Sequence, residues 1–125
     1  MVARLPVLRA ESRLMPWFKV DDNLAFHTKS LRAGNAAMGL WVRAGSWSAQ
    51  QLTDGFIPDE LVGQLGDRRQ AGALVRAGLW HQEDGGFRFH EWDERQPLRR
   101  AVEDKRKKTA ERVRQWRENH RETGE

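Results

Sequence analysis

Residues 78–92, GLWHQEDGGFRFHEW, place two runs of β-forming residues on either side of Asp84-Gly85-Gly86. An Asp-Gly pair between such runs is a strong signal for a hairpin with a two-residue turn. With the turn at Asp84-Gly85, the expected cross-strand pairs are Trp80–Phe89, Gln82–Phe87, His81–Arg88 and Leu79–His90. Because side chains alternate between the two faces, the stretch predicts an aromatic face that closes a core and a basic face opposite.

The residues before the hairpin predict two short helices, 58–66 and 67–77, joined by a tight turn. Pro58 fits the first position of the first helix, while Asp67 caps the second helix and Gly78 ends it. The side chains expected to face inward are Leu61, Leu65, Ala71, Leu74 and Val75. Such a pair of helices is a candidate helix-turn-helix.

Further upstream, a longer helix is expected over 35–52, starting at Asn35. Its apolar stripe comprises Met38, Trp41, Val42, Gly45, Ala49 and Leu52. A short helix from Thr28 to Gly34 precedes it, and residues 53–57 predict a turn and a very short strand. Residues 16–22 fit either a short edge strand or an extended segment.

The order of these elements is that of a winged helix-turn-helix, in which the second helix of the turn enters the DNA major groove beside a β-wing. The predicted fold class is therefore mainly α with a small β-hairpin. Residues 97–123 contain no Gly and no internal Pro, which predicts a long helix after the hairpin. The expected organisation is an N-terminal arm (1–15), the winged helix-turn-helix (16–96) and a basic helical extension (97–125).

Charge is distributed unevenly along the 125 residues, whose net charge is +4. Residues 1–94 contain 11 Lys and Arg against 12 Asp and Glu, whereas residues 95–125 contain 11 against 6. There is no Cys, which excludes disulfides and Cys-based zinc sites. No stretch is apolar enough for a membrane span, and the first fifteen residues do not resemble a secretory signal. We expect a protein of the cytoplasm of a bacterial host, without membrane contact.

Candidate DNA-contacting residues lie on helix 67–77 and on the hairpin. Arg69 and Arg76 flank Gly72 and Ala73, a flat patch that lets a helix approach a groove closely. Arg68 and Gln70 lie near the N-terminal end of this helix, and Arg88 and His90 lie on the basic face of the hairpin. The alternative is an ordinary solvated surface, since acidic residues at 59, 60 and 67 make the surroundings only partly positive.

The C-terminal helix has the densest positive charge in the chain. Its candidate DNA-binding residues are Lys105, Arg106, Lys107, Lys108, Arg112 and Arg114, which cover several sides of the helix. A second interpretation pairs these cations with neighbouring Glu residues at helical spacing. A third uses Val102, Val113 and Trp116 as a sparse apolar seam for a partner helix or for a homodimer.

Catalytic and metal sites find little support. His81 and His90 are diagonal neighbours on one hairpin face, but no third ligand stands at a telling spacing and Glu91 is expected on the other face. There is no phosphate-binding Gly-rich loop, and Ser46 and Ser48 lack a nucleophile-elbow context. We expect no enzyme activity, no cofactor and no metal.

Four segments carry a resemblance to a known family. They are W-F-x-V-D-D (17–22), G-L-W-V-x-A-G-S (39–46), L-T-D-G-F-I-P (52–58) and G-L-W-H…D-G-G-x-R-F-H-x-W (78–92). The chain here resembles the N-terminal winged-helix region of replication-initiation-type proteins from actinobacterial phages and prophages. The resemblance implies a DNA-associated winged helix, with Arg68, Arg69, Gln70 and Arg76 on the helix and Arg88 and His90 on the wing. Family members usually continue beyond the basic helix, whereas this sequence stops at residue 125.

The resulting hypothesis is a phage-type winged-helix protein that binds double-stranded DNA and acts in replication initiation or its regulation. The competing hypothesis is a protein-interaction module that binds a host or phage replication protein, with the C-terminal helix as its docking or self-association element.

Overall fold

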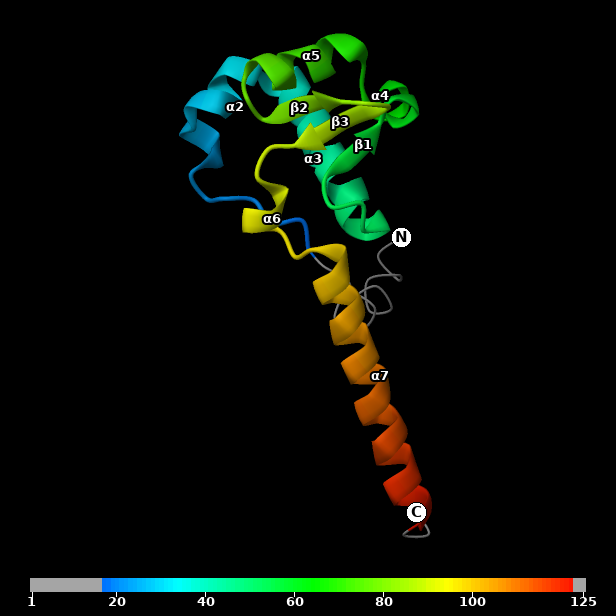
Figure 1. Cartoon of the computed structure of the whole chain (residues 1–125). Helices are drawn as coiled ribbons and strands as arrows, with labels where there is room; N and C mark the ends of the chain where they lie inside the picture. The colour runs from blue at the N-terminus through cyan, green and yellow to red at the C-terminus, as the bar shows by residue number, and fades with distance from the viewer. Residues whose placement is uncertain (1–16, 123–125) are drawn as a thin grey trace, which may run out of the picture.

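The computed structural model describes residues 17–122, so the arm expected over residues 1–15 lies outside the described residues (Figure 1). The chain is mainly helical with a long C-terminal helix, as expected, and the predicted hairpin is part of a small three-stranded antiparallel sheet. The elements are η2 (Leu24–Phe26), α2 (Thr28–Ala33), α3 (Asn35–Gln51), β1 (Phe56–Pro58), α4 (Asp59–Leu65), α5 (Arg68–Arg76), β2 (Trp80–Glu83), β3 (Gly86–Phe89), α6 (Trp92–Arg95) and α7 (Arg99–Glu122).

The hairpin β2–β3 forms in the predicted register. The cross-strand pairs are Trp80–Phe89, His81–Arg88 and Gln82–Phe87, and the backbone N–H of His90 donates to Leu79. The turn is Asp84-Gly85, and Gly85 has a φ of +83°, a conformation that glycine adopts without strain. Strand β1 joins this hairpin through β3, giving the order β1-β3-β2.

The core is built from aromatic rings contributed by distant parts of the chain. Trp80 is fully buried. The ring centroid of Phe89 lies within 6 Å of the ring centroids of Trp80, Trp41 and Trp92. Phe18 closes the same cluster from the N-terminal side, with its ring centroid 5.1 Å from that of Trp41. The prediction that the hairpin's aromatic face closes a core is confirmed for Trp80 and Phe89, while Phe87 is half-buried.

The buried face of α3 differs from the predicted stripe. Trp41, Gly45 and Ala49 are buried as expected, but Val42 is 46% exposed and Met38 and Leu52 are only half-buried. The other buried residues are Ala37, Leu40, Ala44 and Ser48. The stripe was wrong because α3 is surrounded by α2, α4, α5 and β1, so small side chains at the contacts are covered from several directions.

The starts of the short helices deviate by one residue from the predictions. His27 rather than Thr28 caps α2, through its ring nitrogen, and Pro58 is the N-cap of α4 rather than its first residue. In α4 the buried side chain is Val62, whereas Leu61 and Leu65 are half-buried. The Asp67 cap of α5 is confirmed.

Residues 17–21 form an extended segment rather than a strand, which agrees with the second of the two alternatives. Two hydrogen bonds join this segment to the end of α6. The Lys19 backbone N–H donates to Gln96 Oε1 at 2.9 Å, and Gln96 Nε2 donates to the Lys19 carbonyl at 2.7 Å. The sequence did not predict α6, which buries Trp92.

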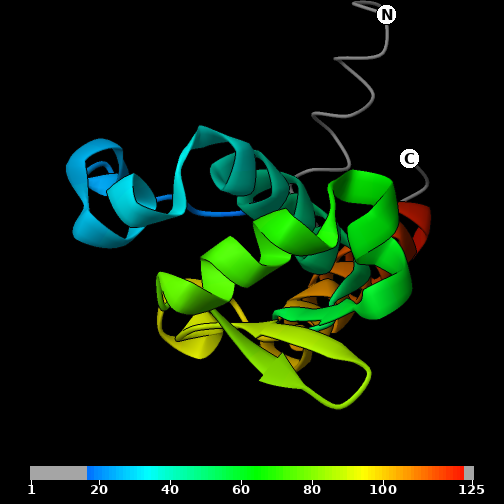
Figure 2. The same ribbon diagram turned by 90° about the horizontal axis from the view of Figure 1, so that it is seen from above.

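Helix α7 extends away from the rest of the described chain. It has 24 residues, which at 1.5 Å per residue gives a length of about 36 Å. Figure 1 places α5 at the top of the compact part and α7 leaving from the bottom, and the view from above in Figure 2 has α5 in front of α7. Within residues 17–122, no helix has the length and apolar character needed to cross a membrane.

Candidate nucleic-acid interface

Helix α5 is held by its inner face and exposes a basic outer face. Ala71 and Leu74 are fully buried, in contact with α3, β2 and α2 on the inner side. Arg69 and Arg76 lie seven residues apart, so they occupy the same outer side of the helix as Gly72 between them. Both arginines are exposed, and neither forms an ion pair with another residue in the described range 17–122.

Between these arginines, Gly72 has no side chain that projects from the outer face of the helix. A Cβ added at Gly72 would meet only the Arg76 guanidinium, at 3.3 Å, so no other part of the fold covers this position. A cationic helix surface without bulky side chains is suited to enter the major groove of DNA, where arginine donates to guanine edges or to phosphates. The local geometry therefore supports the predicted roles of Arg69 and Arg76.

At the N-terminal end of α5, Arg68 and Gln70 have different surroundings. Arg68 is exposed, without an ion pair inside the described part of the chain. Gln70 belongs to a capping box: its backbone N–H donates to Asp67 Oδ1 at 2.8 Å, and its Oε1 accepts from the Asp67 backbone N–H at 3.1 Å. Base contact by Gln70 remains a prediction, and only its amide NH₂ group is left outside these two hydrogen bonds.

The fold brings one further cation to α5 that the sequence analysis missed. Lys29 of α2 lies against the end of α5, and its Nζ donates to the Gly78 carbonyl at 3.4 Å. The two residues are 49 positions apart, so no local pattern could have paired them. Lys29 thus adds positive charge at the C-terminal end of α5, where it also neutralises the negative end of the helix dipole.

On the hairpin, Arg88 is bound within the protein. Its Nε and Nη2 donate to the two Glu83 carboxylate oxygens at 2.6 and 3.0 Å, and its Nη1 donates to the Asp54 carbonyl at 3.0 Å. The hydrogen bonds that Arg88 donates to Glu83 raise the pKa of Arg88 and lower the pKa of Glu83. Phosphate contact by Arg88 remains a prediction, and these three hydrogen bonds leave two of its five N–H groups for it.

The two hairpin histidines contact each other directly. His81 Nε2 lies 2.7 Å from His90 Nδ1, as their diagonal placement predicted, and His90 Nε2 lies 3.1 Å from Glu91 Oε1. The expectation that Glu91 points to the opposite face is wrong. Its φ of +56° ends the strand alternation at this residue and turns the carboxylate toward His90. Among residues 17–122, no three His, Cys, Asp or Glu side chains cluster in a way that could hold a metal ion.

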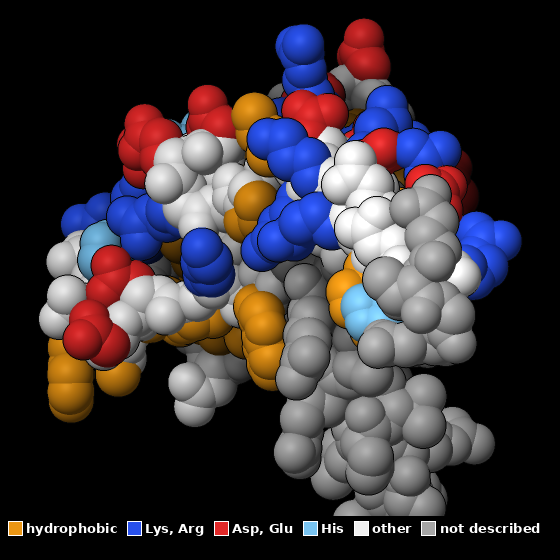
Figure 3. All heavy atoms as spheres, turned by 90° about the horizontal axis from the view of Figure 1, so that it is seen from below, with side chains coloured by type: hydrophobic (Ala, Val, Ile, Leu, Met, Phe, Trp, Pro, Cys, Tyr) orange, Lys and Arg blue, Asp and Glu red, His pale blue; other side chains and the backbone are white. Residues whose placement is uncertain are grey.

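The cations of α7 remain spread around the helix, as predicted. Figure 3, viewed from below, shows Lys and Arg side chains interspersed with acidic side chains on this side of the molecule. Arg114 pairs with Glu111, Arg99 pairs with Glu103 at 2.8 Å, and Arg112 donates to Thr109 at 3.5 Å. Lys105 and Lys108 are exposed and form no ion pair with a described residue.

The three seam residues of α7 do not share one environment. Val102 is buried, whereas Val113 and Trp116 are 42% and 59% exposed. Trp116 is partly covered by its own helix, since the centroids of its ring and the His120 ring are 3.8 Å apart. The exposed apolar surface of α7 is therefore confined to its C-terminal half.

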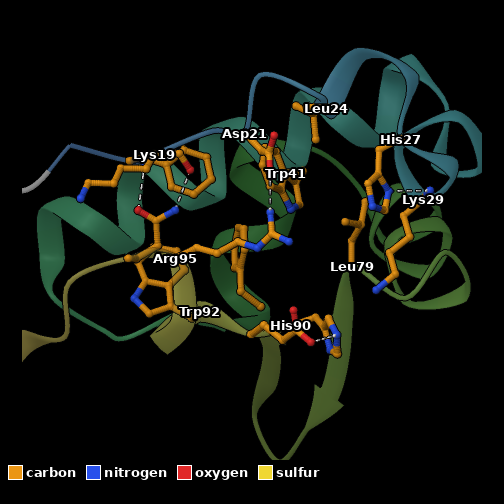
Figure 4. A pocket seen from close by; sticks show the side chains of 14 residues that line it. Lys19, Asp21, Leu24, His27, Lys29, Trp41, Leu79, His90, Trp92 and Arg95 are labelled. Carbon is orange, nitrogen blue, oxygen red and sulfur yellow. Dashed lines mark hydrogen bonds and ion pairs between the residues drawn. The ribbon is translucent and has the colours of Figure 1, made fainter.

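A separate cavity of about 90 Å³ lies between the N-terminal segment, the base of the hairpin and α6 (Figure 4). Its apolar lining includes Trp41, Phe89 and Trp92. Polar side chains at its rim contact one another: Arg95 Nη1 lies 3.5 Å from Asp21 Oδ2, and His90 contacts Glu91. The pKa of Asp21 is lowered, chiefly by the hydrogen bond from the Asn23 backbone N–H.

The candidate residues therefore form two separate groups. Arg68, Arg69 and Arg76 lie on α5 at one end of the molecule, and the α7 cations extend from the other end (Figures 1 and 2). A scan of protein-family models, a search of curated proteins and a search of solved structures give no significant match to this chain.

Proposed function

We propose that the chain is a DNA-binding protein in which residues 35–89 form a winged helix-turn-helix. Support comes from the element order α3, β1, α4, α5, β2, β3 and from the strand order β1-β3-β2. In this arrangement α4 and α5 are the two helices of the turn and the β2–β3 hairpin is the wing. Helix α5 is the recognition helix.

The observation that carries the proposal is the outer face of α5. Three exposed arginines without ion pairs in the described chain, Arg68, Arg69 and Arg76, surround a low surface at Gly72. Exposed arginines whose N–H groups are free can donate to guanine edges or to phosphates when a helix lies in the major groove. The resemblance to replication-initiation-type proteins of actinobacterial phages and prophages supports a role in replication initiation or its regulation.

The test is a fluorescence anisotropy titration with duplex DNA at about 50 and about 200 mM salt. We expect binding that weakens steeply with salt. Once a preferred duplex has been selected from a random library, Arg69→Ala or Arg76→Ala should each cost about 1–3 kcal/mol of binding free energy on that duplex. The same substitutions should cost less on a random duplex, because base contacts carry the discrimination.

Arg43→Ala is the matched control. Arg43 is an exposed arginine on α3, so its loss removes the same charge from a position outside the recognition helix. It should leave the preference between selected and random duplexes unchanged. The proposal fails if the full chain binds no duplex at low salt, or if Arg43→Ala and the α5 variants lose the same affinity on both duplexes.

A protein-interaction function is the second candidate, and exposed apolar side chains favour it. Phe26 of η2 is 87% exposed and Leu31 of α2 is 64% exposed. Under this function the partner is a host or phage replication protein. Pull-down from a bacterial lysate, with and without nuclease, separates the two functions: capture that survives nuclease and is lost in Phe26→Ser supports the protein partner.

A further inference from the structure

The two cationic surfaces of the protein face in opposite directions. Helix α5 covers one end of the compact part, while α7 leaves the other end and points away from it (Figures 1 and 2). Between them lie α3 and the three-stranded sheet, which form the folded core. The arginines of α5 and the cations of α7 therefore do not form one continuous binding surface.

One short duplex cannot contact both surfaces. DNA has a persistence length of about 150 base pairs, so a duplex of about 30 base pairs is close to a straight rod. A rod in contact with the outer face of α5 has the whole compact part between itself and α7. Wrapping it around the protein would require a tight bend over a few helical turns, which costs considerable elastic energy.

Helix α7 has the properties of an independent nucleic-acid surface. Residues 99–122 contain ten Lys and Arg against five Asp and Glu over about 36 Å, and the exposed Lys105 and Lys108 have no ion pair in the described chain. A helix with cations on several sides suits phosphate contact without sequence selection. The same excess charge opposes pairing of two α7 helices along their length.

We propose that the protein binds two separate DNA duplexes at once, one on α5 and one along α7, and so holds them together. This inference rests on the proposed DNA-binding function and adds a bridging activity to it. The α5 contact selects sequence, because it reads base edges, whereas the α7 contact tolerates any sequence.

The test is a capture assay with the full chain. Beads carry one duplex of about 30 base pairs, a second fluorescent duplex of the same length is in solution, and protein is titrated between them. We expect fluorescence on the beads to rise and then fall as excess protein saturates each duplex singly. Light scattering during size-exclusion chromatography records the mass of the free protein at the same concentration.

Two charge variants identify the surfaces. Arg69→Gln with Arg76→Gln removes the α5 contact, and Lys105→Gln with Lys108→Gln weakens the α7 contact. Each variant should lose capture while anisotropy still detects its binding to one duplex. Arg43→Gln serves as the control outside both surfaces and should capture like the unmodified chain.

The outcomes separate this inference from the function on which it rests. No duplex binding by anisotropy refutes the DNA-binding function and the bridging with it. Binding of a single duplex without capture refutes the bridging alone. Capture by a dimer, lost together with the dimer in Trp116→Ala, would overturn the assignment of the second duplex to α7.

Discussion

At the residue scale, single side chains have roles that their neighbours in sequence do not reveal. Ser46 and Ser48 flank the same tryptophan, yet Ser46 is exposed and Ser48 is fully buried. The Ser48 hydroxyl accepts from the Gly55 backbone N–H at 2.8 Å and lies 2.5 Å from Thr53 Oγ1. It thereby fixes the turn before β1, a role that depends on the path of the chain after the helix.

Arg88 is the residue whose predicted role changed most. The sequence placed it on the basic face of the hairpin, and its register there is confirmed. Its guanidinium is nevertheless bound by Glu83 and by the Asp54 carbonyl. The Glu83 contact lies within the hairpin and could be anticipated from strand pairing, whereas the Asp54 contact required the path of the distant turn before β1.

Glu83→Gln tests whether Arg88 contributes to DNA binding. The substitution removes a negative charge and weakens the hold on the guanidinium, so DNA affinity should rise and its salt dependence should steepen. Glu94→Gln, an exposed change on α6, is the charge-matched control. Equal affinities for both variants would contradict a phosphate contact by Arg88, as would an increase that persists when Arg88 is also replaced by Ala.

The lowered pKa of Glu83 gives the same prediction a pH dependence. A carboxyl whose pKa is depressed in the folded protein stabilises the fold above its unfolded value and loses this contribution as the pH falls through the folded value. The Glu83–Arg88 pair therefore persists at neutral pH and opens only in acid, below the ordinary glutamate range. An NMR titration of the Glu83 carboxyl should place its midpoint below the ordinary range of a glutamate side chain.

At the element scale, the glycines of α3 divide into two kinds that the sequence could not distinguish. Gly39 and Gly45 both lie inside this helix. A Cβ at Gly39 would meet no heavy atom within 4 Å, whereas a Cβ at Gly45 would lie 2.2 Å from the Phe18 ring. Only Gly45 is a site of close approach, because the N-terminal segment crosses α3 at that point.

These two glycines predict opposite effects on stability. Gly39→Ala should raise the free energy of unfolding by about 0.5–1 kcal/mol, since alanine favours the helix and fills open space. Gly45→Ala should lower it by about 1–3 kcal/mol, because it displaces Phe18 from its edge-on contact with Trp41 and its stack on Trp92. Urea denaturation of both variants measures the difference. Equal changes of the same sign would show that Phe18 is not held against α3.

At the scale of the whole molecule, α7 is the element least supported by the rest of the fold. Val102 is buried near its start, but residues 110–119 are exposed along the helix. A helix without tertiary packing relies on propensity and on local ion pairs such as Arg114–Glu111. Its distal half should therefore open more readily than the core helices.

Hydrogen exchange provides the measurement. Amides of residues 106–120 should exchange much faster than those of buried positions in α3, because opening α7 does not disrupt the core. Addition of duplex DNA should slow exchange in α7. Protection of α7 in the free protein that grows with protein concentration would contradict this expectation and would indicate self-association through Val113 and Trp116.

The sequence by itself determined the features that depend on near neighbours. These are the hairpin with its turn and register, the Asp67 cap of α5, the long basic helix and the two arginines on one side of α5. Turn chemistry, capping and helical spacing act over a few residues, so a local pattern is enough to specify them. The position of Arg69 and Arg76 on one side of α5 followed from their seven-residue spacing alone.

Only the tertiary structure decided the features that depend on distant contacts. These include the addition of β1 to the hairpin, the buried face of α3, the approach of Lys29 to α5, the binding of Arg88 by Asp54 and the separation of α5 from α7. Each of these features depends on which segments the core brings together. The core does so by burying aromatic rings from distant segments, from Phe18 to Trp92. Such packing is non-directional and long-range, so no local pattern encodes where it places each surface.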